Sequence, residues 1–129
     1  MRVGSLVPGW LAVLAVGCGP SNDSTVPVKG TVTWNGNALL RGNINFLDAD
    51  GKLIPDAGEV IDGKFALRVK PGRKRVEIFA NREGRYDPVM KAHEREQYLP
   101  DRYNARSVLT ADVQVGQDNE FHYPLTDQP

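Results

Sequence analysis

The sequence predicts an all-β protein, an antiparallel sandwich of six or seven short strands. Apolar and polar residues alternate with a period of two in separate runs, which is typical of strands with one buried face. The runs are Val26/Val28/Val32/Trp34, Ile44/Phe46, Phe65/Leu67/Val69, Val76/Ile78/Ala80, Leu109/Ala111/Val113/Val115 and Phe121/Tyr123/Leu125. Turn-forming residues at 35–37, 48–51, 62–64 and 71–72 separate them. This near-regular spacing, without a sustained helical pattern, favours a sandwich.

The strands follow one another with clear boundaries. Residues 48–51 (Asp-Ala-Asp-Gly) suggest a calcium loop, but the glycine and glutamate positions of an EF-hand do not fit, so we expect a hairpin turn. Arg73-Lys74-Arg75 could contact a phosphate or a lipid headgroup, but a solvated strand end is the expected role. Pro124 cannot donate to a ladder, so the last strand should be an edge strand or end there. The residues predicted to point inward are Phe46, Phe65, Leu67, Val76, Ile78, Val113 and Phe121.

Length and charge restrict the possible partners. The 129 residues suffice for one domain with a short leader or tail. Sixteen basic residues balance sixteen acidic ones, which argues against a nucleic-acid partner and against a polybasic membrane anchor. With a single cysteine, no internal disulfide can form.

The N-terminal stretch predicts a targeting signal. After Arg2 comes the apolar run LVPGWLAVLAV, too short to span a bilayer but suited to the h-region of a signal peptide. The following Ala15-Val16-Gly17-Cys18 resembles the lipobox of bacterial lipoproteins. The alternative is a buried free cysteine, but the turn-forming GPSND sequence nearby is poorly suited to burying it.

The lipoprotein resemblance implies a membrane partner through a lipid anchor. In that family the cysteine sulfur receives a diacylglycerol, the leader is cut before it, and the new amino terminus is acylated, as with palmitate. Residues 1–17 would then be the signal peptide, 18–25 a polar tether reaching about 16 Å, and 26–126 the folded domain. Gly19 is not the aspartate that retains lipoproteins at the inner membrane, so the expected location is the cell envelope, at the outer membrane facing the periplasm or the exterior.

Two segments of the domain resemble a further family. GTVTWNGNALLRGNINF and DGKFALRVKPGRKRVEI are similar to the opening segments of carboxypeptidase-regulatory-like, or transthyretin-like, β-sandwich domains. LPDRYNARSVLTADVQVGQDNEFHYPL looks like the closing segment of small lipidated envelope proteins with this domain. The resemblance covers about residues 26–126 and implies a seven-stranded transthyretin-like sandwich. It says little about activity.

No catalytic or metal site is expected. The sequence has no G-x-S-x-G, P-loop or G-x-G-x-x-G pattern, and Ser107 has no recognisable histidine partner. His122 is expected on the outward face of its strand, and His93 lacks a second ligand cluster for zinc. The hydroxyisourate hydrolases of the transthyretin-like fold end in Tyr-Arg-Gly-Ser, which this chain lacks. We therefore predict a protein without enzymatic activity and without a cofactor.

Residues 82–106 interrupt the strand rhythm with mostly charged sequence. Such long connections tend to be functional or disordered. One short helix is expected from Asp87-Pro88 to about Gln97. Two interpretations stay open, a structural flap closing one end of the sandwich with Tyr103 on the core, and a partner-binding surface. The candidate partner-binding residues are Arg85, Tyr86, Lys91, His93, Arg95, Tyr98 and Arg102.

Three functional hypotheses follow. The first is a lipid-anchored, non-enzymatic envelope module for protein interaction, adhesion or scaffolding, with an envelope protein or polysaccharide as partner. The second is a module that binds carbohydrate or another small ligand; Trp34 shares the parity of Val28 and Val32, however, and is expected in the core rather than on a binding face. The third, a hydrolase, is disfavoured by the missing triad.

Overall fold

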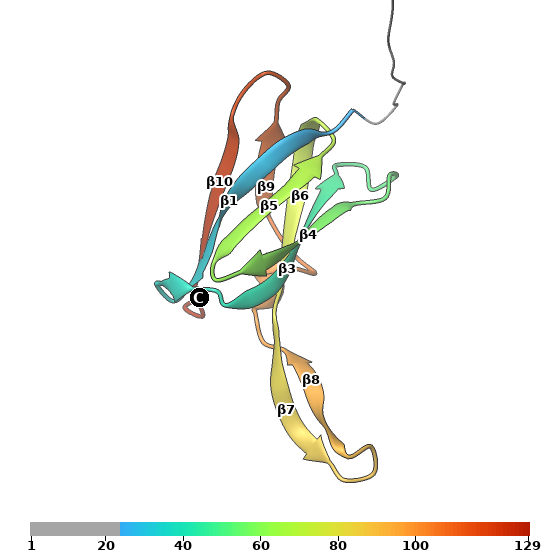
Figure 1. Ribbon diagram of the computed structural model, residues 1–129, viewed down its shortest axis with the longest axis vertical. Helices are drawn as coiled ribbons and strands as arrows, with labels where there is room; N and C mark the ends of the chain where they lie inside the picture. Colours follow the sequence, from blue (N-terminus) through green and yellow to red (C-terminus); the bar gives the residue numbers. More distant parts are fainter. Residues whose placement is uncertain (1–23) are drawn as a thin grey trace, which may run out of the picture.

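The computed structural model describes residues 24–129, so the predicted signal peptide, Cys18 and most of the tether lie outside the described residues. Ten strands and one short 3-10 helix make up the described chain (Figure 1). The strands are β1 (Val26–Trp34), β2 (Asn37–Ala38), β3 (Arg41–Asp48), β4 (Asp56–Ile61), β5 (Lys64–Val69), β6 (Gly72–Phe79), β7 (Asn81–Asp87), β8 (Ala92–Gln97), β9 (Leu109–Val113) and β10 (Asn119–Leu125). The 3-10 helix η1 spans Asp101–Tyr103. The all-β prediction is confirmed.

One curled, mainly antiparallel sheet forms the body of the protein. Its strand order is β10-β1-β5-β4-β3-β6-β9, with β2 added to the end of β1. The prediction of purely antiparallel pairing is wrong at one place, because β10 runs parallel to β1. After β9 the chain crosses to the opposite edge of the curled sheet, so β10 pairs not with β9 but with β1. As predicted, the strand that carries Pro124 is an edge strand.

Aromatic contacts show that the curled sheet closes on a single core. The ring of Phe46 on β3 lies 6.1 Å from that of Phe65 on β5 and 6.5 Å from that of Phe121 on β10. The two sides of the curl therefore face each other in a β-sandwich-like arrangement. Of the residues predicted inside, five are buried, namely Phe46, Phe65, Val76, Ile78 and Val113. Leu67, Phe121 and Trp34 are half-buried and pack against this core.

Glycine at position 30 makes the parallel pairing possible. A Cβ atom there would lie 1.8 Å from the backbone oxygen of Phe121 on β10 and 2.6 Å from the ring of Phe65. No side chain fits such a space, since real Cβ atoms stay beyond about 3 Å. Gly30 thus lets β1 lie directly over Phe65 while pairing with β10.

The turns predicted from the sequence at residues 48–51 and 62–64 are both present. Gly51 donates its N–H to the carbonyl oxygen of Asp48 at 3.0 Å, which makes residues 48–51 a hairpin turn. At the turn between β4 and β5, Asp62 and Gly63 have φ angles of 53° and 77°, the left-handed values that aspartate and glycine tolerate best.

The basic run 73–75 differs from the prediction of a solvated strand end. Lys74 is only 3 % exposed and donates to the Asp48 carboxylate at 2.5 Å. Arg75 pairs with Glu77. Lys74 alternates in step with the buried Val76 and Ile78, which places it on the inner face of β6, and Asp48 neutralises the ammonium there.

The predicted helix at 88–97 is wrong, because this stretch belongs to the hairpin of β7 and β8. We call residues 81–97 the arm. Asp87 accepts backbone N–H bonds from Val89 (2.8 Å) and Met90 (3.3 Å), and its carbonyl accepts one from Lys91 (2.8 Å). These bonds close a tight turn rather than cap a helix. An isolated helix of ten residues without a buried apolar face would also be marginal.

Residues 98–107, the closing segment, return from the arm onto the core. Tyr103 is 9 % exposed, and its hydroxyl accepts from the N–H of Thr126 at 3.0 Å. The Asn104 amide donates to the carbonyl oxygen of Ile78 at 3.2 Å, and the Ser107 hydroxyl donates to that of Val76. The two interpretations of residues 82–106 therefore apply to different parts. The structural-flap interpretation fits the closing segment, which packs on the core, and the partner-binding interpretation is left to the arm.

Candidate functional site

The arm projects from the sheet at the end opposite to the start of β1 (Figure 1). Every residue of β8 is exposed, and on β7 only Gly84 and Asp87 are half-buried. A hairpin that buries almost nothing adds little to the hydrophobic stability of the domain. Its sequence is therefore free to serve contacts with other molecules.

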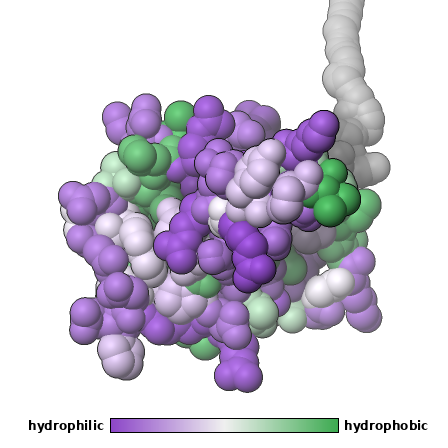
Figure 2. Space-filling view, turned by 90° about the horizontal axis from the view of Figure 1, so that it is seen from below, coloured by the Kyte–Doolittle hydropathy of each residue, from purple (hydrophilic) through white to green (hydrophobic). Residues whose placement is uncertain are grey.

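The tip of the arm combines an aromatic ring with two apolar side chains. Tyr86, Val89 and Met90 are 50 %, 86 % and 72 % exposed. We call these three residues the arm tip. Seen from the end that carries the arm, the surface is mostly hydrophilic, with separate apolar patches (Figure 2). Tyrosine and methionine beside charged residues are common in binding surfaces.

Charges along the arm are balanced. Four cations (Arg82, Arg85, Lys91, Arg95) stand beside four carboxylates (Glu83, Asp87, Glu94, Glu96). Only one pair among them approaches an ion-pair distance, Arg82 Nε to Glu96 Oε1 at 3.6 Å. The arm therefore carries no net field that would select a strongly acidic or basic partner.

His93 is held by the arm itself. Its ring packs edge-on against Tyr86 with centroids 5.2 Å apart, and its Nδ1 lies 3.1 Å from the carbonyl oxygen of Gly84. Within residues 24–129, no group of three or more His, Cys, Asp or Glu side chains is placed to hold a metal ion. The contacts of His93 orient Tyr86 at the tip.

The base of the arm is fixed to the body. The Gln97 side-chain oxygen accepts from the N–H groups of Ala80 (3.2 Å) and Leu99 (3.1 Å), and its amide donates to the Leu99 carbonyl at 2.8 Å. Tyr98 packs against Trp34 with ring centroids 5.9 Å apart, and Arg82 stacks over Tyr98. These contacts set the direction in which the arm leaves the sheet.

The predicted partner-binding residues separate into two groups. Arg85, Tyr86, Lys91, His93 and Arg95 lie together on the arm, and Tyr98 lies at its base. Arg102 lies elsewhere, in η1, where its guanidinium donates to the carbonyl oxygens of Thr126 (2.5 Å) and Gln128. Arg102 is thus engaged in holding the C-terminal segment.

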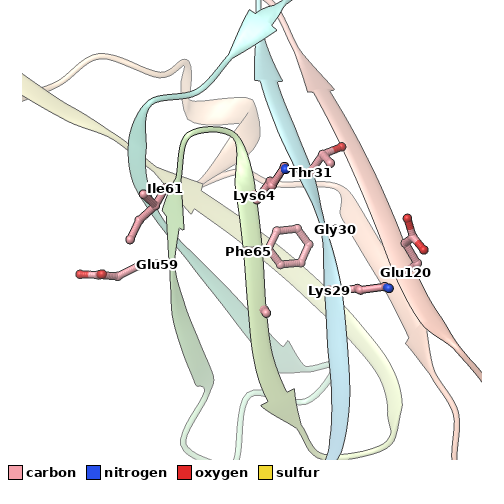
Figure 3. A pocket seen from close by; sticks show the side chains of 9 residues that line it. Lys29, Gly30, Thr31, Glu59, Ile61, Lys64, Phe65 and Glu120 are labelled. Carbon is pink, nitrogen blue, oxygen red and sulfur yellow. The ribbon is translucent and has the colours of Figure 1, made fainter.

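A second candidate region lies on the outer face of β5, β1 and β10. Strand register places side chains there in two rows across these strands, Lys64–Thr31–His122 and Ala66–Lys29–Glu120. These strands form one wall of a hollow of about 710 Å³, which Lys29, Lys64 and Glu120 border (Figure 3). Glu59 and Ile61 of β4 border its other side.

Three side chains beside this hollow form a hydrogen-bonded chain. His122 Nδ1 lies 2.8 Å from Thr31 Oγ1, and Nε2 lies 3.2 Å from Glu120 Oε2. In a neutral imidazole, donation from Nε2–H to Glu120 leaves Nδ1 as the acceptor of the Thr31 hydroxyl proton. The order hydroxyl–imidazole–carboxylate is that of a catalytic triad. His122 and Glu120 are 56 % and 49 % exposed, however, and water weakens the electrostatics that catalysis requires.

The lysines of the hollow differ from Lys70, Lys74 and Arg75, the body residues that form ion pairs with carboxylates. In the described part of the chain, neither Lys29 nor Lys64 has a carboxylate within ion-pair distance, whereas Lys70 and Lys74 do. His122 points outward as predicted, but its hydrogen-bond partners were not predicted. They depend on the parallel register of β1 and β10, which the alternation of apolar and polar residues does not reveal.

Comparison with known proteins does not place the chain in a family. No model of a known protein family matches the sequence, and neither a curated protein nor a solved structure matches it. Among residues 24–129, no helix is long and apolar enough to cross a membrane.

Proposed function

We propose that this protein is a lipid-anchored, non-enzymatic module of the cell envelope that presents the arm to a partner, an envelope protein or polysaccharide. The observation that carries this proposal is the placement of the arm. It leaves the body at the end opposite to the start of β1, the strand that follows the predicted tether (Figure 1). An anchor at Cys18 would therefore leave the arm on the side away from the lipid.

The anchor is tested by removing its sulfur. Replacing Cys18 by Ser should abolish acylation and move the protein from the membrane fraction to the soluble fraction, because the acyl chains supply the hydrophobic anchoring. Mass spectrometry and fractionation measure the two effects separately. Pelleting of the Ser variant at the wild-type level would contradict the anchor.

The binding role of the arm is tested by hydrogen exchange on the anchored protein, with and without envelope extract. Slower exchange at 82–96, lost when Tyr86 and Met90 are changed to Ser, supports the proposal. A Val108→Ser variant is the control, because Val108 is also an exposed apolar residue (81 %) but lies outside the arm. Protection on another face, with the arm unchanged, would reduce the arm to a passive hairpin.

We also propose that the body is a transthyretin-like sandwich. Its support is the similarity of the segments at 30–46 and 62–78, which form β1 to β3 and β5 to β6. The Asn35-Gly36 turn and the Asp62-Gly63 turn, both with positive φ angles, stand where that family has such turns. An experimental structure whose strand order differs from that of transthyretin-like sandwiches would contradict this proposal.

A second candidate function is binding of a small ligand in the hollow on β5, β1 and β10. Two unpaired ammonium groups next to the Thr31 hydroxyl favour a carboxylate that also carries hydroxyl groups, such as a uronic acid. Titration with glucuronate, followed by NMR shifts of Thr31 and His122, tests this. Lys64→Gln should weaken the effect, and Lys52→Gln on the exposed loop before β4 should not.

A further inference from the structure

Three turns meet at the end of the body where β1 begins. Val26 pairs with Val69, which places the turn at 70–72 beside the start of β1. Lys70 donates through its N–H (2.9 Å) and its ammonium (3.0 Å) to Asp56, which brings the loop at 49–55 alongside. Gly72 pairs with Val113, so the turn at 114–118 lies there as well. We call these three turns the near end, and Figure 1 shows it opposite to the arm.

The near end exposes apolar side chains that the core does not use. Leu53, Ile54 and Val115 are 54 %, 84 % and 69 % exposed. Two exposed cations, Lys52 and Arg73, and two exposed carboxylates, Asp50 and Asp118, stand in or next to the same turns. Exposed apolar side chains suit the boundary between headgroups and acyl chains, where they are buried, and a nearby lysine or arginine can meet lipid phosphates.

The predicted tether keeps this end close to the lipid. Only five residues lie between Cys18 and Ser24, the first described residue, so six Cα–Cα steps join the two. A fully extended chain gains at most about 3.6 Å per residue, so the body begins within about 22 Å of the acylated sulfur. Among surfaces with exposed apolar side chains, the near end is the one from which the tether leaves. The arm tip lies at the other end and is turned away.

We infer that the near end is a lipid-contact surface, with Leu53, Ile54 and Val115 inserted at the interface of the bilayer that holds the anchor. This inference rests on the lipid anchor proposed above. Insertion fixes the orientation of the body, because a tether alone would allow it to tumble. The arm is then held pointing away from the membrane.

Two matched tryptophan variants of the full-length lipidated protein test this orientation. Ile54→Trp places the reporter at the near end, and Val89→Trp places it at the arm tip, both at exposed positions (84 % and 86 %). Each is made with Trp34→Phe, so that the mature chain holds one tryptophan. The protein is reconstituted in phosphatidylglycerol vesicles containing dibrominated phosphatidylcholine. Fluorescence of the Ile54→Trp variant should be quenched several-fold more strongly than that of the Val89→Trp variant.

The possible outcomes distinguish failure of the lipid-contact surface from failure of the lipid anchor on which it rests. Absence of the acyl mass would contradict the anchor itself. A lipidated protein with equal quenching at both positions, or stronger quenching at position 89, would overturn the lipid-contact surface and leave the anchor intact. Because Trp34→Phe alters the base of the arm, hydrogen exchange of the wild-type protein provides a second measurement. Exchange at 52–55 and 115–117 should be slower in vesicles than in detergent, and unchanged exchange there would overturn the inference.

Discussion

The Tyr123 hydroxyl donates a hydrogen bond to the carbonyl oxygen of Thr110 at 3.0 Å. The two residues lie on β10 and β9, the strands at opposite ends of the sheet order. The bond therefore ties together the two edges of the curled sheet. Tyr123 is 7 % exposed and stacks on Phe65, so the phenol closes the core as well as the sheet.

The stability of the protein should fall at alkaline pH through Tyr123. Burial raises the pKa of the Tyr123 phenol well above its usual value. Above pH of about 10 the unfolded chain releases this proton while the folded chain retains it, so the free energy of unfolding decreases as pH rises, by up to about 1.4 kcal/mol per pH unit. Urea unfolding between pH 8 and 11 measures this slope. Tyr123→Phe should flatten it, and Tyr86→Phe, at a half-exposed ring, should not; an unchanged slope in Tyr123→Phe would contradict the assignment.

Gly30→Ala should destabilise the domain by about 1–3 kcal/mol or more, as overpacking does. The new methyl group would collide with the Phe121 carbonyl, a backbone atom that cannot move without breaking the β1–β10 ladder. Gly84→Ala on the arm is the matched control, since its nearest neighbour atom is 3.4 Å from the Cβ position. Thermal melts of both variants make the comparison, and equal melting temperatures would mean that the two strands are not so closely paired.

Phe65→Ala should cost about 3–5 kcal/mol, because it leaves a cavity at the centre of the core. Phe65 is 3 % exposed and contacts rings on both sides of the curl. Such a loss approaches the whole stability of a domain, about 5–15 kcal/mol. The half-buried Phe121, changed to Ala, should cost less. Denaturant unfolding gives both free energies. A Phe65→Ala protein with the same melting temperature as the wild type would contradict the central position of Phe65 in the core.

Charge removal should separate the arm from the closing segment. Arg85→Gln, Lys91→Gln and Arg95→Gln should each change the free energy of unfolding by no more than about 0.5 kcal/mol, as for other exposed positions. Arg102→Gln should cost about 1–2 kcal/mol, because charge-assisted bonds to two carbonyl groups are lost. Chemical denaturation of the four single variants decides between these expectations. Equal losses at Arg95 and Arg102 would show that the arm contributes to the fold.

The sequence predicts those strands of the protein in which one face is buried against the core. Val76, Ile78 and Val113 alternate with polar residues because one side of each strand meets the core, and their inward direction was predictable. Val115 continues the same alternation but lies beyond the end of β9 and is exposed, because the strand stops at Val113.

The arm could not be predicted in the same way. Both faces of β7 and β8 meet water, so no period of two appears in their sequence. Asp87-Pro88 was interpreted as a helix start because the same side-chain acceptor serves helix caps and turns. The hollow beside Thr31 and His122 depends on two strands far apart in the sequence and on a parallel register, which no local pattern encodes.

The pairing of β1 with β10 makes completion of the fold depend on β10, which follows every other strand of the sheet in the sequence. Thr31 and His122 are 91 residues apart in the sequence, yet neighbours in the sheet. Closing a loop of that length costs entropy that only the final contacts recover, and topologies dominated by such contacts fold slowly. Before β10 pairs with β1, one edge of β1 is unpaired and Phe65 lacks the Tyr123 ring that stacks on it. A nascent chain therefore stays open until β10 has been made, and a product truncated before Asn119 would leave the edge of β1 free to pair with strands of other chains.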